Sequence, residues 1–258
     1  MAGGVSRGLS VLEALVGRVD GMTLAEVADL TGLPKSAVHR LLAELSEAGY
    51  VRQDGALGEY MLTLRFVSQG LRHLSHIGVV NLAKPLLADL AREARALVRL
   101  SLVDGDGLVF VGRFQGATTG LRYDPEHGDV VHLVSSASGY AWLSQLPEDR
   151  ALQIAYAQGF GDETEHGPNC PRTVDELRAR LAQTAKNGVA EVEDSFEVGT
   201  SALAAPVRNG DGDVIGVVSI AGPTALLDHA RRAELSQPLL DVTARLTALD
   251  LPVGSGLT

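Results

Sequence analysis

The sequence predicts an α+β protein that begins with a winged helix-turn-helix and continues through a linker helix into a larger α+β domain. Three observations carry this prediction. Apolar residues recur at a helical period on both sides of a Gly-Leu-Pro break at residues 32–34. Two short extended runs around Asp54-Gly55 and Gly58 follow, as in a β-hairpin. Farther along, strand-like runs with hairpin turns alternate with helical segments.

Composition limits the class of protein. The chain has 258 residues, of which 45% are hydrophobic and 4% aromatic, which is enough for a core built mainly from Leu, Val and Ala. Its apolar runs are far shorter than the ~18 residues of a membrane span, and its first ten residues contain no apolar signal region. Its single cysteine cannot form an internal disulfide. We therefore expect a cytoplasmic protein with no membrane partner.

The negative charge is unevenly distributed. The net charge is −10, which is unusual for a DNA-binding protein. Residues 1–75, however, carry 7 Lys and Arg against 8 Asp and Glu, whereas residues 76–258 carry 15 against 24. The first part is therefore close to neutral, and the overall charge does not exclude DNA binding.

The helix-turn-helix is predicted over residues 23–49. Thr23 and Glu26 have the spacing of a capping box. Ala28 is small enough for two helices to cross closely, Gly32 makes the turn, and Val38 anchors the second helix from below. The outward face of that helix then carries five residues that suit phosphates and base edges, namely Lys35, Ser36, Ala37, His39 and Arg40.

Each residue of that face has a predicted contact in double-stranded DNA. Lys35, Ser36 and His39 are expected in the groove, Arg40 at a base or a phosphate, and Ala37 at a thymine methyl group. Alternatively, His39 is a neutral phosphate contact or a partly buried packing residue. Two such units on a two-fold axis would recognise a palindromic operator with half-sites about one helical turn apart, or a multiple of that.

The hairpin that follows is interpreted as the wing. Its available cation is Arg52, which we expect at the DNA backbone or minor groove. A small helical domain with an incidental hairpin is the alternative. We assign residues 1–62 to the DNA-binding domain and residues 63–80 to the linker helix. In the linker, His73 and His76 are three residues apart, but no third ligand is nearby, so solvated histidines are favoured over a metal site.

For residues 81–258 the sequence predicts an α/β domain, specifically of the α+β class, in which helices flank a mostly antiparallel sheet. A helix over 81–96 has Pro85 in its first turn and packs through a leucine stripe of Leu82, Leu86, Leu90 and Leu97. Further helices are expected at 148–157, 173–187 and 233–249, and residues 158–172 are expected to form a loop. Strands are expected at 98–103, 108–114, 120–123, 189–193, 201–208 and 213–222, and residues 130–146 are expected to pass from strand into helix.

Several motifs resemble the IclR family of bacterial transcriptional regulators. They are SRGLSVLEAL, GLPKSAVHRLLAEL, the following Gly-Tyr-Val, SASGYAWL, LAAPV and SIAGP, and the resemblance spans nearly the whole chain. It implies a winged helix-turn-helix, a linker helix and a GAF-like effector-binding domain. It also implies a homodimer formed through the DNA-binding part that pairs again into a homotetramer. The effector would either release the protein from DNA or tighten its binding.

The resemblance also implies positions for an effector pocket. In the member of the family that responds to glyoxylate, the pocket uses small residues before a helix start, an acidic residue upstream of the AAP strand, a cysteine that begins this strand, and two serines in the last strand. The matching positions here are Ala137, Ser138, Tyr140 (a lysine in the pattern), Val192, Ala202, Ser219 and Ala221.

This chain departs from that pattern towards apolar side chains. Val192, Ala202 and Ala221 replace polar or reactive residues, although Glu193 or Asp194 is an alternative for the acidic role. A pocket with fewer fixed donors suits a larger, partly apolar ligand. We therefore expect a small-molecule effector that is an aromatic or medium-sized organic acid, ester or amide.

Aromatic and cationic side chains could contact such a ligand. Stacking is expected from Trp142, Tyr140, Tyr123 and Phe110, each of which could instead be ordinary core. A ligand carboxylate would pair with Arg113 or Arg122.

No catalytic constellation is predicted. Cys170 has His166 four residues away, but no third group orients a base against it, so a free surface or half-buried thiol is favoured. The sequence contains no GxSxG, Walker A or HExxH motif, and we expect no cofactor, metal or enzymatic activity. A ligand-responsive transcription factor is therefore the favoured hypothesis. The alternatives are a small-molecule enzyme that assembles through its helix-turn-helix, and an architectural DNA-binding protein with an inactive sensor domain.

Overall fold

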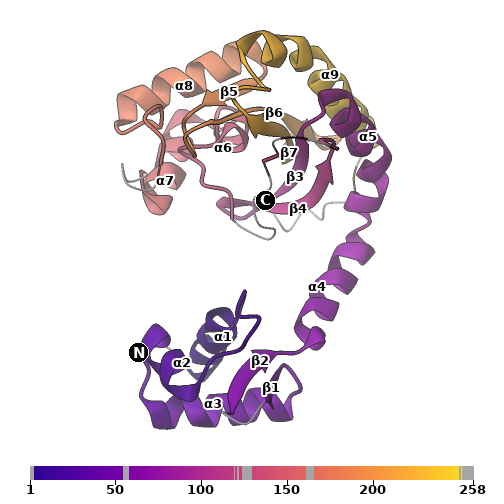
Figure 1. Ribbon diagram of the computed structural model, residues 1–258. Helices are drawn as coiled ribbons and strands as arrows, with labels where there is room; N and C mark the ends of the chain where they lie inside the picture. Colours follow the sequence, from indigo (N-terminus) through magenta and orange to yellow (C-terminus); the bar gives the residue numbers. More distant parts are fainter. Residues whose placement is uncertain are drawn as a thin grey trace. The chain divides into compact units, whose positions relative to one another are not determined.

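The computed structural model describes residues 3–54, 58–118, 120, 122–123, 130–160, 166–249 and 251. The chain divides into two compact units, Met1–His76 and Ile77–Thr258, which we describe separately (Figure 1). The predicted hairpin tip at Gly55 and Leu121 of a predicted strand lie outside the described residues. Given their lengths and apolar content, none of the helices in the described part of the chain could cross a lipid bilayer.

The first unit is a three-helix domain with a hairpin and a final helix. Its elements are α1 (Gly4–Ala14), α2 (Leu24–Thr31), α3 (Lys35–Glu47), β1 (Val51–Asp54), β2 (Glu59–Leu62) and α4 (Leu64–Ile77). Thr23 and Glu26 form the predicted capping box at the start of α2. Gly32 ends that helix in the left-handed conformation, with φ at 66°.

The crossing of α2 and α3 has the predicted packing. Val27 and Ala28 of α2 and Val38 and Leu42 of α3 are all buried in one apolar core. Strands β1 and β2 pair antiparallel, and Tyr60 joins the same core. The order of helices, turn and hairpin confirms the predicted helix-turn-helix with a hairpin after it.

Helix α4 differs from the other helices of this unit because none of its residues is buried. Its apolar side chains Leu64, Val67 and Leu71 are exposed within the described part of the chain. It covers most of the segment predicted as a linker helix and ends at Ile77. The domain boundaries at residues 62 and 80 stay predictions.

The second unit is built on one five-stranded sheet in the order β4-β3-β7-β6-β5, in which all neighbouring strands pair antiparallel. The strands are β3 (Leu97–Asp104), β4 (Gly107–Gln115), β5 (Ala190–Glu193), β6 (Thr200–Arg208) and β7 (Val214–Pro223). The helices are α5 (Val79–Ala94), α6 (Ala137–Leu143), α7 (Glu148–Gln158), α8 (Val174–Asn187) and α9 (His229–Ala248). This arrangement confirms the predicted α+β class.

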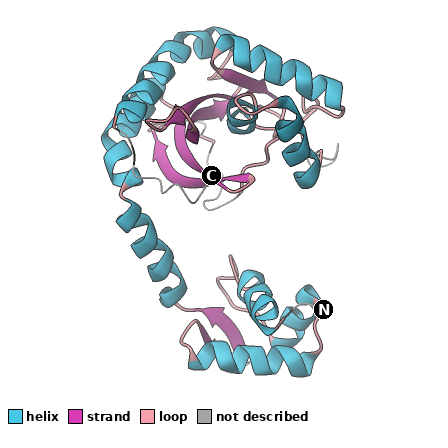
Figure 2. Ribbon diagram, turned by 180° about the vertical axis from the view of Figure 1, so that it is seen from behind, coloured by secondary structure: helices cyan, strands magenta, loops and turns pink. Residues whose placement is uncertain are grey.

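The sheet separates two apolar cores. Helices α5 and α9 cover one face, and α6, α7 and α8 lie on the other (Figures 1 and 2). Side chains alternate between these cores along the strands. In β3, for example, Leu100 packs towards α5 and α9, whereas Val103 packs towards α6. The cavity described below lies on the α6 side.

The leucine stripe predicted for α5 is partly wrong. Leu82 is 48% exposed, and the buried face consists instead of Val79, Ala83, Leu87, Leu90, Ala91 and Ala94. The helix begins at Val79, two residues before the predicted start, which places Pro85 in the second turn rather than the first. Proline has no N–H, so Pro85 cannot donate a helical hydrogen bond to the Asn81 carbonyl one turn earlier. Asn81 is exposed, so water can bond that carbonyl instead.

The strand predicted at 120–123, and the strand predicted to open the segment 130–146, are also wrong where the structure describes them. Arg122 and Tyr123 have no regular secondary structure, and Val130 makes only an isolated bridge to Val109. The side chain of Gln158 takes the hydrogen bonds that a strand ladder would have used. It donates to the Val131 carbonyl at 2.9 Å and accepts from the Leu133 amide at 2.7 Å.

Helix α9 begins four residues earlier than predicted. Its first residue is His229, because the Asp228 side chain accepts a hydrogen bond from the Arg231 amide at 2.8 Å and so caps the helix. Thr173 and Glu176 form the predicted capping box of α8.

Candidate functional site

The exposed face of α3 is formed by the residues that the sequence predicts. Val38, Leu41 and Leu42 are buried against α1 and α2 and fix the rotation of the helix. Lys35, Ser36, His39 and Arg40 are consequently exposed, and Ala37 is partly exposed. The interpretation of His39 as a partly buried packing residue is therefore wrong.

The two arginines predicted to contact DNA are held differently. Arg40 pairs with Glu44 one turn later at 3.7 Å, and both side chains are largely exposed, so this ion pair is weak. Arg52 forms an ion pair with Asp54 and also approaches the Met61 sulfur at 3.3 Å. The cation of the hairpin is thus already engaged within the hairpin.

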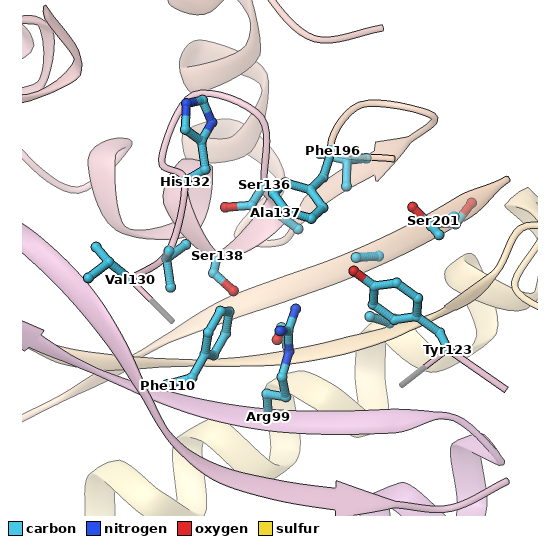
Figure 3. A pocket seen from close by; sticks show the side chains of 16 residues that line it. Arg99, Phe110, Tyr123, Val130, His132, Ser136, Ala137, Ser138, Phe196 and Ser201 are labelled. Carbon is cyan, nitrogen blue, oxygen red and sulfur yellow. The ribbon is translucent and has the colours of Figure 1, made fainter. Parts of the chain in front are cut away.

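The second candidate site is a cavity of about 120 Å³ between the sheet and the start of α6 (Figure 3). All five strands contribute to its lining. Eight residues predicted to contact the effector line it: Ala137, Ser138, Val192, Ala202, Ser219, Ala221, Tyr123 and Phe110.

Four residues predicted for the pocket lie outside this lining: Tyr140, Trp142, Arg113 and Arg122. Tyr140 is buried, and its hydroxyl donates to the Val134 carbonyl at 2.7 Å. Trp142 is also buried in the core on the α6 side. Both lie beyond the first two residues of α6, Ala137 and Ser138, which are the residues of this helix that line the cavity. Arg113 lies on β4, where it pairs in register with Arg99, and it is Arg99 that lines the cavity.

The lining also contains residues that were not predicted from the sequence: Arg99, Val130, Val131, His132, Ser136, Phe196, Thr200 and Ser201. A signal was available for Arg99, because a charged residue between Val98 and Leu100 interrupts an otherwise apolar strand. Ser136 had a signal as the N-cap of α6, where its side chain accepts from the Gly139 amide at 3.1 Å.

Arg99 lies against an aromatic wall. Its guanidinium carbon is 3.8 Å from the centre of the Phe110 ring, a cation–π arrangement. In Figure 3, Arg99 and Phe110 rise side by side from the sheet towards Ser138. Burial raises the pKa of Tyr123, and the positive charge of Arg99 partly offsets that effect. Tyr123 therefore keeps its proton at neutral pH and can donate a hydrogen bond.

The lining of the cavity also contains His132, which is uncharged. The Nδ1 atom of His132 is 2.7 Å from the Ser135 hydroxyl oxygen. The rings of His132 and His166 meet edge to face, with centroids 4.2 Å apart. Burial, and secondly the proximity of His166, lowers the pKa of His132 to about 4. His132 is therefore neutral at physiological pH.

Hydroxyl groups provide the remaining polar atoms. The Ser201 hydroxyl donates to Thr224 at 3.1 Å and accepts from the buried Arg232 guanidinium at 3.0 Å. Arg232 also pairs with Glu191 and Glu193. By contrast, the Ser219 hydroxyl is buried and has no hydrogen-bond partner among the described residues. A buried polar group without a partner costs roughly 1–3 kcal/mol, so this position favours a polar ligand atom.

Other candidate chemistry finds less support. Within the described ranges, no three His, Cys, Asp or Glu side chains are placed to hold a metal ion. Cys170 is buried rather than at the surface, with its sulfur 4.0 Å from the Val134 carbonyl oxygen. His73 and His76 of α4 are both exposed.

Both parts of the chain match family models. Residues 4–55 match the IclR helix-turn-helix domain, and residues 71–248 match the C-terminal domain of the bacterial transcriptional regulator IclR. The chain belongs to the IclR family. It is therefore a DNA-binding transcriptional regulator of the IclR type, as the sequence motifs implied.

Relatives and solved structures of the IclR family match over nearly the whole chain. The DNA-binding transcriptional repressor YiaJ of Escherichia coli is 30% identical over 246 residues, covering 93% of this chain and 85% of YiaJ. The transcriptional repressor IclR of the same organism is 26% identical, covering 94% of this chain and 88% of IclR.

Two solved structures show the same fold. One is an IclR regulator from Alicyclobacillus acidocaldarius, with a TM-score of 0.83, 21% identity and coverage of 97% of this chain and 99% of that one. The other is an IclR homologue from Microbacterium hydrocarbonoxydans in complex with 4-hydroxybenzoate. Its TM-score is 0.80 and its identity 20%, and the match covers 98% of this chain and 100% of that one.

Proposed function

We propose that this IclR-family regulator is a repressor that binds a palindromic operator, and that a small organic effector in the cavity changes its operator affinity. The observation that carries the proposal is the cavity itself, which combines apolar walls with a few polar groups in the manner of a ligand site. The relatives named as repressors support the regulatory direction.

The exposed face of α3 is the proposed reading surface. Lys35, Ser36 and His39 contact the groove, Ala37 meets a thymine methyl group, and Arg40 binds a base or a phosphate. Their exposure supports this assignment. The weak ion pair between Arg40 and Glu44 leaves the guanidinium free to exchange partners.

The wing makes a smaller contribution in this proposal. Arg52 would have to leave Asp54 to contact the DNA backbone, because it is already paired within the hairpin. We therefore assign it to backbone positioning and not to sequence recognition.

The effector is proposed to be an aromatic or partly apolar acid, ester or amide. Small or apolar side chains at Val192, Ala202 and Ala221 leave few donors for a very small polar acid. The 4-hydroxybenzoate bound by the Microbacterium homologue supports an aromatic ligand. The six residues that were predicted from the motifs and line the cavity are the proposed contacts, together with Tyr123, and Ser219 is a polar one.

Self-association is part of the proposal. Two helix-turn-helix units on a two-fold axis are needed to read two half-sites. The exposed apolar residues Leu64, Val67 and Leu71 of α4, with Val5 and Leu9 of α1, support a homodimer through the first unit. We further propose that two dimers pair.

Footprinting upstream of this gene and its neighbours tests the DNA-binding part. Wild-type protein should protect a palindrome. Arg40→Ala and Lys35→Ala should weaken protection and lower the salt dependence of binding, because each removes a cation at the phosphates or bases. Lys186→Ala, an exposed lysine of the second unit, is the matched control and should behave as wild type. An unchanged footprint and salt dependence for Arg40→Ala would reject α3 as the reading surface.

A further inference from the structure

Helix α3 ends in a hydrogen-bonded turn at Gly49 and Tyr50. The Tyr50 amide donates to the Leu45 carbonyl at 2.9 Å, and the Gly49 amide donates to the Ser46 carbonyl at 2.9 Å. These two bonds are those of a Schellman motif. Gly49 has a φ of 77°, the left-handed conformation that this motif requires directly after the last residue of the helix. The last turn of α3 and these two residues therefore form one hydrogen-bonded structure.

Thr63, the residue before α4, is bonded to the same turn. Its amide donates to the Tyr50 carbonyl at 2.9 Å, and its hydroxyl donates to the Gly49 carbonyl at 2.6 Å. The hydroxyl oxygen also accepts a hydrogen bond from the Arg65 amide at 3.2 Å, in the first turn of α4. A single hydroxyl group thus links the end of α3 to the start of α4.

The side chain of Arg65 adds a second contact at the same place. Its guanidinium carbon lies 5.2 Å from the centre of the Tyr50 ring, which is within cation–π range. A Cβ atom added at Gly49 would lie 3.2 Å from the Arg65 Nη1 atom, so the arginine side chain lies across the glycine. We call Gly49, Tyr50, Thr63 and Arg65 the α3–α4 joint.

The α3–α4 joint holds the start of a helix that has little other support. None of the residues of α4 is buried, so α4 has no buried packing within the first unit that would fix it along its length. In the chain, Gly78 alone separates α4 from α5, the first helix of the second unit. A displacement of α4 therefore acts on α3 through the joint, and a displacement of α3 acts on α4 in the same way.

We propose that the α3–α4 joint couples the reading helix α3 to α4, with Thr63 and Arg65 as positioning residues. This inference rests on the proposed function, and it names the residues through which regulation passes between the two helices. Coupling free energies are reciprocal, so operator DNA bound at α3 must alter α4 to the extent that α4 alters DNA binding. The coupling is therefore testable with DNA as the only ligand.

Hydrogen–deuterium exchange of the full-length protein, read by mass spectrometry, tests the coupling. The probe is an operator duplex selected from random DNA with the wild-type protein and added at saturation. Operator binding should slow the exchange of the α4 amides in the wild type, because fixing α3 also fixes the first turn of α4 through the joint.

Two variants remove the joint contacts separately. Thr63→Val keeps the shape of the side chain and lacks the hydroxyl, and Arg65→Met lacks the guanidinium. Both should bind the operator within about tenfold of the wild type, since a single hydrogen bond contributes modestly, yet lose the slowing in α4. Thr63→Ser keeps the hydroxyl and should retain the slowing. Arg72→Met, at another exposed arginine of α4, is the matched control and should respond as the wild type.

The outcomes separate this inference from the proposed function. If no operator is selected, the proposed function is rejected, and the inference with it. If α4 exchanges equally with and without operator in the wild type, or if the slowing persists in both variants, the joint does not couple the helices, whereas the proposed function stands. Folded variants that no longer bind the operator at all would show that the joint holds α3 itself, which overturns the coupling role. Circular dichroism checks each fold, and should Thr63→Val fail to fold, Arg65→Met, at an exposed residue, decides.

Discussion

His132 makes the stability of the second unit depend on pH. Its pKa is about 4 in the folded protein, mainly because of burial, against about 6.5 when unfolded. Between these values the unfolded chain binds a proton that the folded chain does not. The stabilising contribution is therefore complete above about pH 6.5 and is lost as the pH falls towards 4.

Replacing His132 by glutamine should flatten this dependence. The melting temperature of His132→Gln should fall less than that of the wild type between about pH 7.5 and 5, as measured by scanning calorimetry. His39→Gln, at an exposed position of α3, should follow the wild type. A His132→Gln variant that loses stability as steeply as the wild type would show that another group titrates.

Most site residues that a motif carried were predictable, although Tyr140 lies outside the lining. Ala137 and Ser138, matched through the motif SASGYAWL, do line the cavity. Side chains chosen by type alone were less successful. Arg113 was chosen and Arg99 was not, although the two are opposite each other. Which of two facing arginines lines a cavity depends on how the sheet packs against the rest of the unit, and a local sequence pattern does not contain this information.

At the scale of elements, the start of α6 depends on a close backbone approach. A Cβ atom added at Gly139 would lie 2.0 Å from the Leu133 carbonyl oxygen, with no flexible side chain to move aside. Residues Ala137 and Ser138 in the same turn form part of the cavity wall. Because Gly139 has no side chain, α6 can approach the Leu133 backbone closely, and this close approach fixes the position of the cavity wall.

Gly139→Ala should destabilise the protein by about 1–3 kcal/mol or more, measured by urea unfolding of the full chain. It should also weaken the binding of any ligand in the cavity, because α6 must shift away from Leu133. Gly222→Ala is a control in the same unit. There an added Cβ would meet its nearest atoms at an ordinary 3.8 Å, so we expect a change within about 1 kcal/mol. Equal stability losses in the two variants would contradict this account.

Elements defined by local signals were predictable from sequence, and elements defined by distant contacts were not. The capping boxes at Thr23 and Thr173 and the left-handed Gly32 depend on residues within a few positions. The segment that begins at Val130 makes only an isolated bridge there, and its hydrogen bonds at Val131 and Leu133 go to Gln158, which is more than twenty positions away. The composition of that segment, which is rich in valine, is typical of a strand.

In the whole molecule, an effector bound in the second unit must change DNA binding by the first unit for the protein to act as a ligand-responsive regulator. Such a change needs two states of the protein that the ligand binds with different affinity. A coupling free energy of roughly 1–3 kcal/mol would shift operator affinity by about 5–150-fold. The near neutrality of residues 1–75 makes specific contacts from α3 more important than overall charge for holding the operator.

Control of DNA binding by the cavity is tested by the operator dissociation constant, measured by fluorescence anisotropy at fixed salt with and without saturating benzoate, a one-ring aromatic acid. For the wild type we expect a shift of about 5–150-fold. At the same benzoate concentration, Ala202→Phe, which narrows the cavity that Ala202 lines, should show a much smaller shift. The exposed Lys186→Ala control should show the wild-type shift. If calorimetry shows benzoate bound to the wild-type protein while its operator affinity stays unchanged, the cavity does not control DNA binding and the account is wrong.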